Sequence, residues 1–150
     1  MNNYEKMIKV LTIFSNTFKG TNIVVGGSMA MYVHGFKVKP HDLDVELENP
    51  DKSTLAALQT MDKLVHEQDD SIKLLYEKLD GHYRIMILGV YVDVWVVEKI
   101  DYNRVVEYEG FKFGDVISVL KKKMFMHRDK DYKALTNYIE QLISTQPIEL

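Results

Sequence analysis

The sequence predicts a single α/β (α+β) domain, residues 1–150, in which helices flank a mixed β-sheet. Three observations lead to this prediction. The chain has 150 residues, close to the usual size of one domain. It is 46% hydrophobic and 27% charged, which supplies enough apolar material for a core. Segments with the apolar period of a helix alternate with segments with the period of a strand, in the order α-β-α-β-α-β-β-β-α-α.

The first third of the chain predicts a helix, a strand, a turn and a second helix. Apolar residues recur at helical spacing over residues 3–19, and a glycine follows them. Residues 23–25 are an apolar, β-branched run typical of a strand. This strand ends in Gly26-Gly27-Ser28, after which residues 29–32 suit a short helix. The local pattern is therefore strand, glycine turn and helix.

Residues 42–48 alternate between acidic and apolar side chains. Because side chains of a strand point to opposite faces in turn, this alternation predicts a half-exposed strand. One of its faces is apolar, and the other carries the carboxylates of Asp42, Asp44, Glu46 and Glu48.

The remaining elements follow from turn signals and periodicity. Asn49-Pro50-Asp51 ends the acidic strand, and Asp51 or Ser53 can cap a helix over residues 53–66. Three strands are predicted next, at residues 72–77, 82–88 and 90–97, the first two as a hairpin across Asp80-Gly81. The chain closes with a C-terminal pair of helices at about 114–145. The first is capped by Asp115, and Pro147 ends the second.

Composition excludes several classes of function. The absence of cysteine rules out disulfides, thiol nucleophiles and zinc-thiolate sites. No apolar run approaches the roughly 20 residues that cross a bilayer. We therefore expect a cytoplasmic protein with no membrane partner. The net charge of −3 argues against a nucleic-acid binder that uses its whole surface, but leaves room for a local basic patch.

Two features of this framework could bind a ligand through phosphate or metal chemistry. Gly26-Gly27-Ser28 lets a ligand approach the backbone, although paired glycines between a strand and a helix are more often only a tight turn. Asp42 and Asp44 project from the same face of one strand, about 7 Å apart, and could share hard cations. Most acidic strand faces are merely solvated.

A third feature is Asp93, the one charge in the apolar strand 91–97. Burying a lone carboxylate is costly, so Asp93 requires a partner. A metal shared with Asp42 and Asp44 would provide one, and nearby Arg84 could also pair with a carboxylate. The alternative is an aspartate at a strand end, bonded to a loop. Together the three features compose a two-metal site for phosphoryl transfer.

This combination resembles the DNA polymerase β-type nucleotidyltransferase superfamily. The likeness rests on Val25-Gly26-Gly27-Ser28, then Asp42-Leu43-Asp44-Val45, then Asp93 in a later strand, and it covers about residues 20–97. The resemblance implies a minimal nucleotidyltransferase fold. It also implies that Gly26, Gly27 and Ser28 hold nucleotide phosphates, that Asp42 and Asp44 bind two Mg²⁺ ions (or Mn²⁺), and that Asp93 completes one metal site and helps to deprotonate the acceptor.

The segment 123–131 resembles the "K…A…R.KD" segment of small, stand-alone nucleotidyltransferases, including abortive-infection toxins of bacterial toxin–antitoxin pairs. Met126 departs from it, since a small residue is usual there. On a helical wheel Lys123 flanks the apolar stripe and should turn inward, whereas Lys121 and Lys122 lie on the outer side. We expect Lys123 to meet the triphosphate, reinforced by Arg128 or Lys130. The alternative is a solvated basic helix.

The resemblance implies transfer of a nucleoside monophosphate from an NTP, ATP among them, to an acceptor hydroxyl, with release of pyrophosphate. A basic run from Lys112 to Lys133, with seven Lys or Arg against three Asp, favours tRNA or a protein as acceptor. An aminoglycoside or lincosamide hydroxyl is the alternative, for which Glu46, Glu48 and Asp51 could form an acidic pocket. A non-catalytic nucleotide-binding protein, such as one partner of a toxin–antitoxin pair, is a second alternative.

Three aromatic side chains near the predicted site could stack a base or simply pack: Tyr83, Tyr91 and Trp95.

Overall fold

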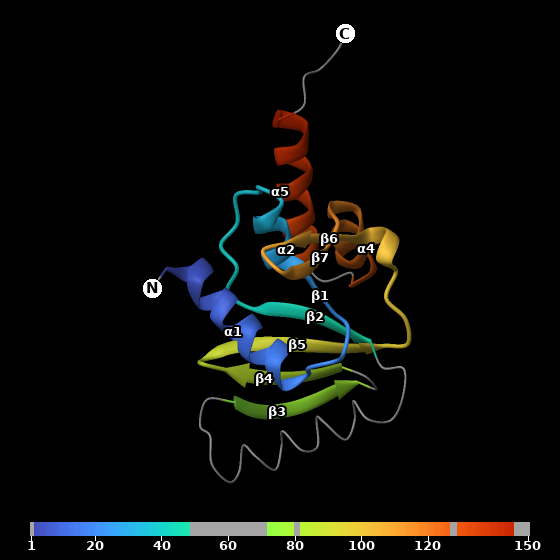
Figure 1. The fold of residues 1–150 in the computed structure, drawn as a ribbon. Coiled ribbons are helices and arrows are strands. Elements are labelled where there is room, and N and C mark those ends of the chain that lie inside the picture. The colour runs from blue at the N-terminus through green and yellow to red at the C-terminus, as the bar shows by residue number, and fades with distance from the viewer. Residues whose placement is uncertain (1, 49–71, 80–81, 127–128, 146–150) are drawn as a thin grey trace.

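The structure is a computed structural model that describes residues 2–48, 72–79, 82–126 and 129–145. Its centre is a seven-stranded mixed sheet in the order β3-β4-β5-β2-β1-β7-β6 (Figure 1). The predicted mixed sheet with flanking helices is confirmed. The predicted helix 53–66, with its caps Asp51 and Ser53, lies outside the described residues, as do Arg128 and the turn Asp80-Gly81.

The helices and strands of the described residues have the following bounds. The helices are α1 (Asn3–Thr17), α2 (Gly27–Val33), the 3-10 helix η1 (Tyr102–Arg104), α4 (Val116–Met126) and α5 (Asp129–Thr145). The strands are β1 (Ile23–Gly26), β2 (Leu43–Glu48), β3 (Ile72–Leu79), β4 (His82–Ile87), β5 (Val90–Val97), β6 (Val105–Tyr108) and β7 (Phe111–Gly114).

The central strands pair in a way that separates a polar face from an apolar one. β2 runs antiparallel to β1 and parallel to β5, and β5 runs antiparallel to β4. Because residues paired across a ladder project to the same side, Asp44, Glu46 and their partners on β5 and β4 share one face. The intervening residues of β2, Leu43, Val45 and Leu47, are fully buried on the other face.

Helix α1 covers the apolar face and supplies much of the core. In Figure 1 it lies across β5 and β4, while α2, α4 and α5 lie together near β1, β7 and β6. The side chains of α1 that enter the core are Met7, Val10, Leu11 and Phe14, all at most 1% exposed. Asn2 caps the helix by accepting a hydrogen bond from the backbone N–H of Glu5. The polar face is therefore left to α4.

Apart from its last residue, the β6–β7 hairpin lies in a segment, residues 98–113, for which the sequence predicts neither a helix nor a strand. β7 extends the sheet by pairing in parallel with β1. The side chains of β6 are mostly exposed and do not alternate, so the period-two signal of a strand is missing. The turn between the two strands has positive φ at both Glu109 and Gly110, as a tight hairpin requires.

Strand 90–97 is confirmed as β5, whereas several other predicted boundaries are wrong by one or two residues. Helix α1 ends at Thr17 rather than at residue 19, because Phe18 leaves the helical conformation and its N–H bonds back to Phe14. Helix α2 begins at Gly27, two residues before the prediction. β4 ends at Ile87 because Leu88 and Gly89 turn with positive φ. Such shifts are expected where helix ends and turns are read from sequence.

Within the described ranges, no helix combines the length and the hydropathy that a membrane span requires.

Replacing Phe14 with alanine tests the contribution of α1 to the core. Phe14 is fully buried and its ring lies 4.7 Å from that of Phe18, so Phe14→Ala should lower the free energy of unfolding by about 3–5 kcal/mol. Urea unfolding would measure the loss. The control is Phe125→Ala, at a side chain that is 81% exposed, which should change stability by less than about 0.5 kcal/mol. Equal effects of the two substitutions would contradict this account.

Candidate active site

A row of four residues crosses the polar face of the sheet. The strand registers pair Gly26 with Asp44, Asp44 with Asp93, and Asp93 with Arg84. Two aspartates that are 49 positions apart in the sequence thus become direct neighbours on parallel strands. Asp42 lies one residue before β2 and is exposed. The sheet therefore brings the predicted glycine turn and the three predicted carboxylates to one place.

The backbone of Gly27 packs directly against the carboxylate of Asp44. Gly27 has φ +59°, a conformation that side chains rarely adopt, and a Cβ atom there would lie 2.3 Å from Oδ2 of Asp44. No side chain can fit between the two. The glycine is thus required both by the backbone conformation and by its close approach to the carboxylate.

The environment of Asp44 disfavours its charged form. Burial raises the pKa of this carboxyl above its usual value, and the neighbouring Asp93 and Asp42 raise it further. Lys122 and Lys123 oppose this shift but do not cancel it. A carboxylate in such a place gains from additional positive charge beside it.

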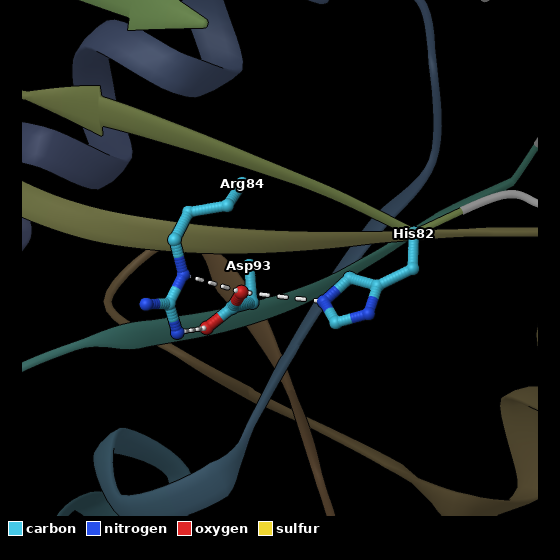
Figure 2. Close-up of polar contacts among 3 residues, drawn as sticks. All are labelled: His82, Arg84 and Asp93. Carbon is cyan, nitrogen blue, oxygen red and sulfur yellow. Dashed lines mark hydrogen bonds and ion pairs between the residues drawn. The ribbon is translucent and has the colours of Figure 1, made fainter. Parts of the chain in front are cut away.

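Asp93 is held by Arg84 and His82, as Figure 2 shows. It is 7% exposed. Arg84 donates from Nε to Oδ1 and from Nη2 to Oδ2, each at 3.0 Å, in a two-pronged contact. His82 Nε2 lies 3.2 Å from Oδ1. The prediction that Arg84 pairs with a carboxylate is confirmed, and the buried charge of Asp93 is balanced within the sheet.

Trp95 lies beside Asp93 and its partners, in contact with His82 of β4 and Lys122 of α4. Its ring stacks on that of His82 with centroids 3.6 Å apart, and Nζ of Lys122 lies 4.6 Å from its centroid. Nε1 of Trp95 is buried without a hydrogen-bond partner in the described part of the chain. Trp95 thus packs against His82 and Lys122 of the site rather than in the apolar core.

Two lysines of α4 turn toward the site, whereas the sequence predicted one. Lys123 is partly buried and lies 3.3 Å from Asp131, a fully buried carboxylate of α5. The expectation that Lys122 lies on the outer side is wrong. Its ammonium lies 3.9 Å from Glu46, and burial lowers its pKa although Glu46 and Asp44 raise it. Both lysines, at successive positions of α4, therefore lie close enough to Asp44 to influence its charge.

Two cavities meet at Asp44. The first, which we call the aspartate cavity, has a volume of about 220 Å³ and contains the predicted residues Ser28, Asp42, Asp44, Asp93, Lys123 and Lys130 in its wall. Lys39, His41, His82, Arg84 and Trp95 also line it. The second, which we call the valine cavity, has a volume of about 390 Å³. Its wall includes Gly26, Gly27 and Asp44 together with the apolar side chains of Val24, Val97, Ile100, Val105 and Val119.

The structure therefore groups most predicted site residues and adds others. The additional ones are His82, Lys39 and Lys122. His82 has a signal in the sequence, since it precedes Arg84 by two positions and shares its strand face. Lys39 has none, because it lies in an exposed loop before Asp42, where no helix or strand period indicates the direction of its side chain.

The donor groups of the aspartate cavity fit a hard divalent cation. Carboxylate oxygens are the ligands that Mg²⁺ and Mn²⁺ prefer, and Asp42 and Asp44 enter the cavity together. Among residues 2–48, 72–79, 82–126 and 129–145, no three acidic or histidine side chains are grouped closely enough to hold a metal. Asp93 is instead engaged by Arg84 and His82. The fit thus rests on the pair Asp42 and Asp44.

Comparison with solved structures identifies this architecture. A candidate nucleotidyltransferase from Thermotoga maritima aligns with a TM-score of 0.57 at 16% identity, over 91% of this chain and 94% of that one. ANT(2'')-Ia in complex with adenylyl-2''-tobramycin aligns with a TM-score of 0.59 at 10% identity, over 91% and 88%. This chain has a nucleotidyltransferase fold. The resemblance inferred from the sequence is thereby confirmed for the fold.

The same fold forms part of a larger protein, the Megavirus polyadenylate synthase, which aligns with a TM-score of 0.58 at 15% identity. That alignment covers 93% of this chain and 32% of the viral one. No family model matches the sequence, and no curated protein matches it. At these identities the likeness concerns the nucleotidyltransferase fold, so the chemistry has to rest on this chain's own residues.

Substitution of Gly27 tests its contact with Asp44. Gly27→Ala adds a Cβ at 2.3 Å from Oδ2 and should lower the free energy of unfolding by about 1–3 kcal/mol beyond the cost of Gly35→Ala. Gly35 is a matched control, because it has φ +94° but a Cβ atom added there would meet no atom within 4 Å. Urea unfolding of both variants gives the difference. Equal losses would mean that the carboxylate does not need the glycine.

A double-substitution cycle tests the ion pair between Arg84 and Asp93. Arg84→Met leaves a buried carboxylate uncompensated and should cost about 3 kcal/mol of stability. Adding Asp93→Asn should recover part of this loss, because the stranded charge is removed. Chemical unfolding of the single and double variants measures the coupling. Strictly additive losses would show that the two side chains do not stabilise each other.

Proposed function

We propose that the protein is a metal-dependent nucleotidyltransferase that moves a nucleoside monophosphate from an NTP to a hydroxyl of an acceptor and releases pyrophosphate. The observation that carries this proposal is the row of Gly26, Asp44 and Asp93 across three strands, with Gly27 packed against Asp44. The row lies between two cavities, so that groups can approach Asp44 from two sides. A displacement at phosphorus needs such access, because the attacking and leaving oxygens lie roughly in line.

Asp42 and Asp44 are the proposed ligands of Mg²⁺ or Mn²⁺. The ion supplies positive charge that neutralises the phosphate oxygens as the reaction proceeds. The raised pKa of Asp44 is consistent with a site that is completed by a cation. Ser28, Lys123 and Lys130 line the same cavity and are proposed to bind the β and γ phosphates. Arg128 keeps its expected supporting role as a prediction, since it lies outside the described residues.

The reaction forms one bond and breaks one. The acceptor oxygen bonds to the α-phosphorus, and the bond from that phosphorus to the oxygen of the leaving pyrophosphate breaks. Asp93 is proposed to orient the acceptor hydroxyl and take its proton, while Arg84 and His82 fix the direction of its carboxylate. Most of the rate would come from positioning and charge neutralisation.

We favour a hydroxyl of RNA, such as tRNA, or of a protein as the acceptor. Lys39, His41 and Lys130 are exposed residues in the wall of the aspartate cavity, and they add to the basic surface of α4. Such a rim attracts a polyanion and disfavours a cationic drug. The fold of ANT(2'')-Ia keeps an aminoglycoside acceptor as the alternative. A non-catalytic nucleotide-binding protein, with an antitoxin as partner, is the other alternative.

Substitution of Asp44 tests the proposed activity. The purified protein would be incubated with each α-labelled NTP, Mg²⁺ or Mn²⁺, and total cellular RNA and protein. We expect label on a macromolecule with the wild type, and a loss of roughly 100-fold or more with Asp44→Asn, because the cation loses a ligand charge. The band that carries the label identifies the acceptor class.

The matched control is Glu107→Gln, which removes a carboxylate from an exposed position of β6 and should keep full activity. Release of pyrophosphate only when aminoglycosides are added would favour the drug acceptor. Equal labelling by the wild type and Asp44→Asn would overturn the assignment of the metal ligands. Absence of both labelling and pyrophosphate release would favour the non-catalytic alternative.

A further inference from the structure

We propose that the valine cavity binds the nucleoside part, base and ribose, of the NTP. This inference rests on the proposed function, which places the phosphates in the aspartate cavity. At about 390 Å³ the valine cavity is the larger of the two, and its volume is within the usual range for small-molecule sites. The valine cavity is therefore large enough for the nucleoside part, which we do not expect the aspartate cavity to hold together with the phosphates.

The walls of the valine cavity have the chemistry of a base-binding slot. Apolar side chains enter it from β1, β5, β6 and α4, namely Val24, Val97, Val105 and Val119. Aliphatic walls suit the flat faces of a base, and polar groups at the edges select its orientation. Such edge groups are present as Ser118, Glu46 and Asp101, beside the cationic side chains of Lys99, Arg104, Lys121 and Lys122.

The connection between the two cavities favours the nucleoside, rather than the acceptor, as the occupant of the valine cavity. Gly26, Gly27 and Asp44 line the valine cavity, and Asp44 also lines the aspartate cavity. One molecule can therefore extend past Asp44 from one cavity into the other. Asp93, the proposed partner of the acceptor hydroxyl, lines the aspartate cavity and is not among the residues that line the valine cavity. The acceptor is thus expected on the side of Asp93.

The wall around Val105 is held in place by a small network centred on Asp115. Its Oδ1 accepts a hydrogen bond of 2.7 Å from the backbone N–H of Ser118, and its Oδ2 lies 3.6 Å from Nη1 of Arg104. The backbone N–H of Asp115 in turn donates to the carbonyl of Arg104 at 2.8 Å. This network ties the start of β6 to the start of α4, so the two sides of the cavity are built before a ligand binds.

A bulky side chain at Val105 tests the inference. Binding of the four Mg²⁺–NTPs, as α,β-methylene analogues, and of Mg²⁺–tripolyphosphate would be measured by calorimetry. Val105→Trp fills the cavity and should weaken analogue binding by about tenfold or more, while tripolyphosphate binding stays within about twofold. Val106→Trp is the matched control. It adds the same side chain at the next position of β6, which is 43% exposed and does not line the cavity, and should leave both unchanged.

Each other outcome has a defined meaning. Unchanged analogue binding in a folded Val105→Trp protein, with reduced transfer to the acceptor, would overturn the inference in favour of an acceptor site. Equal weakening of analogue and tripolyphosphate would also overturn it. A wild type that binds the analogues no more tightly than it binds tripolyphosphate would also overturn the inference. A wild type that binds neither the analogues nor tripolyphosphate would instead refute the proposed function. If Val105→Trp does not fold, Ser118→Phe fills the cavity from α4 and decides by the same criteria.

Discussion

The contact between the Gly27 backbone and the Asp44 carboxylate is the constraint around which the site is built. It requires β1 and β2 to pair in the one register that places Gly26 opposite Asp44. A shift of one residue would turn Asp44 toward the core and Leu43 and Val45 toward solvent, because side chains alternate along a strand. Burial of Leu43 and Val45 in the core thus keeps the carboxylate of Asp44 on the polar face. Stability and site geometry are set by one register.

Charge balance is the second organising factor of the polar face. Asp93 forms an ion pair with Arg84 and a hydrogen bond with His82 within the sheet, and Asp131 of α5 forms an ion pair with Lys123 of α4. Asp44 and Asp42 receive no such close partner in the described residues, and Asp44 has a raised pKa. The uncompensated carboxylates therefore gather where the two cavities meet. This distribution is why a cation and a phosphate chain are the ligands that the site suits best.

The sequence singled out residues that the structure brings together, but it missed the strands at one sheet edge. The pattern of apolar residues pointed to three aspartates: Asp42 and Asp44 alternate with apolar residues, and Asp93 is the one charge in an apolar strand. Gly27 could be singled out because it stands between a strand and a helix. The β6–β7 hairpin could not be found, since an exposed edge strand such as β6 need not alternate. The inward position of Lys122 was also missed. A helical wheel takes the apolar side of a helix as its buried side, but Lys122 of α4 faces polar and aromatic side chains of the sheet.

By itself the sequence determined the order of the main elements, the two faces of β2 and the types of residue available for phosphate and metal chemistry. These follow from local periodicity and turn chemistry, which act over a few residues. The tertiary structure alone decided which residues meet: the register of Asp44 with Asp93, the pairing of Asp93 with Arg84 and His82, and the cavity between β5, β6 and α4. Those contacts join segments far apart in the chain, so they depend on strand pairing and packing that no local pattern encodes.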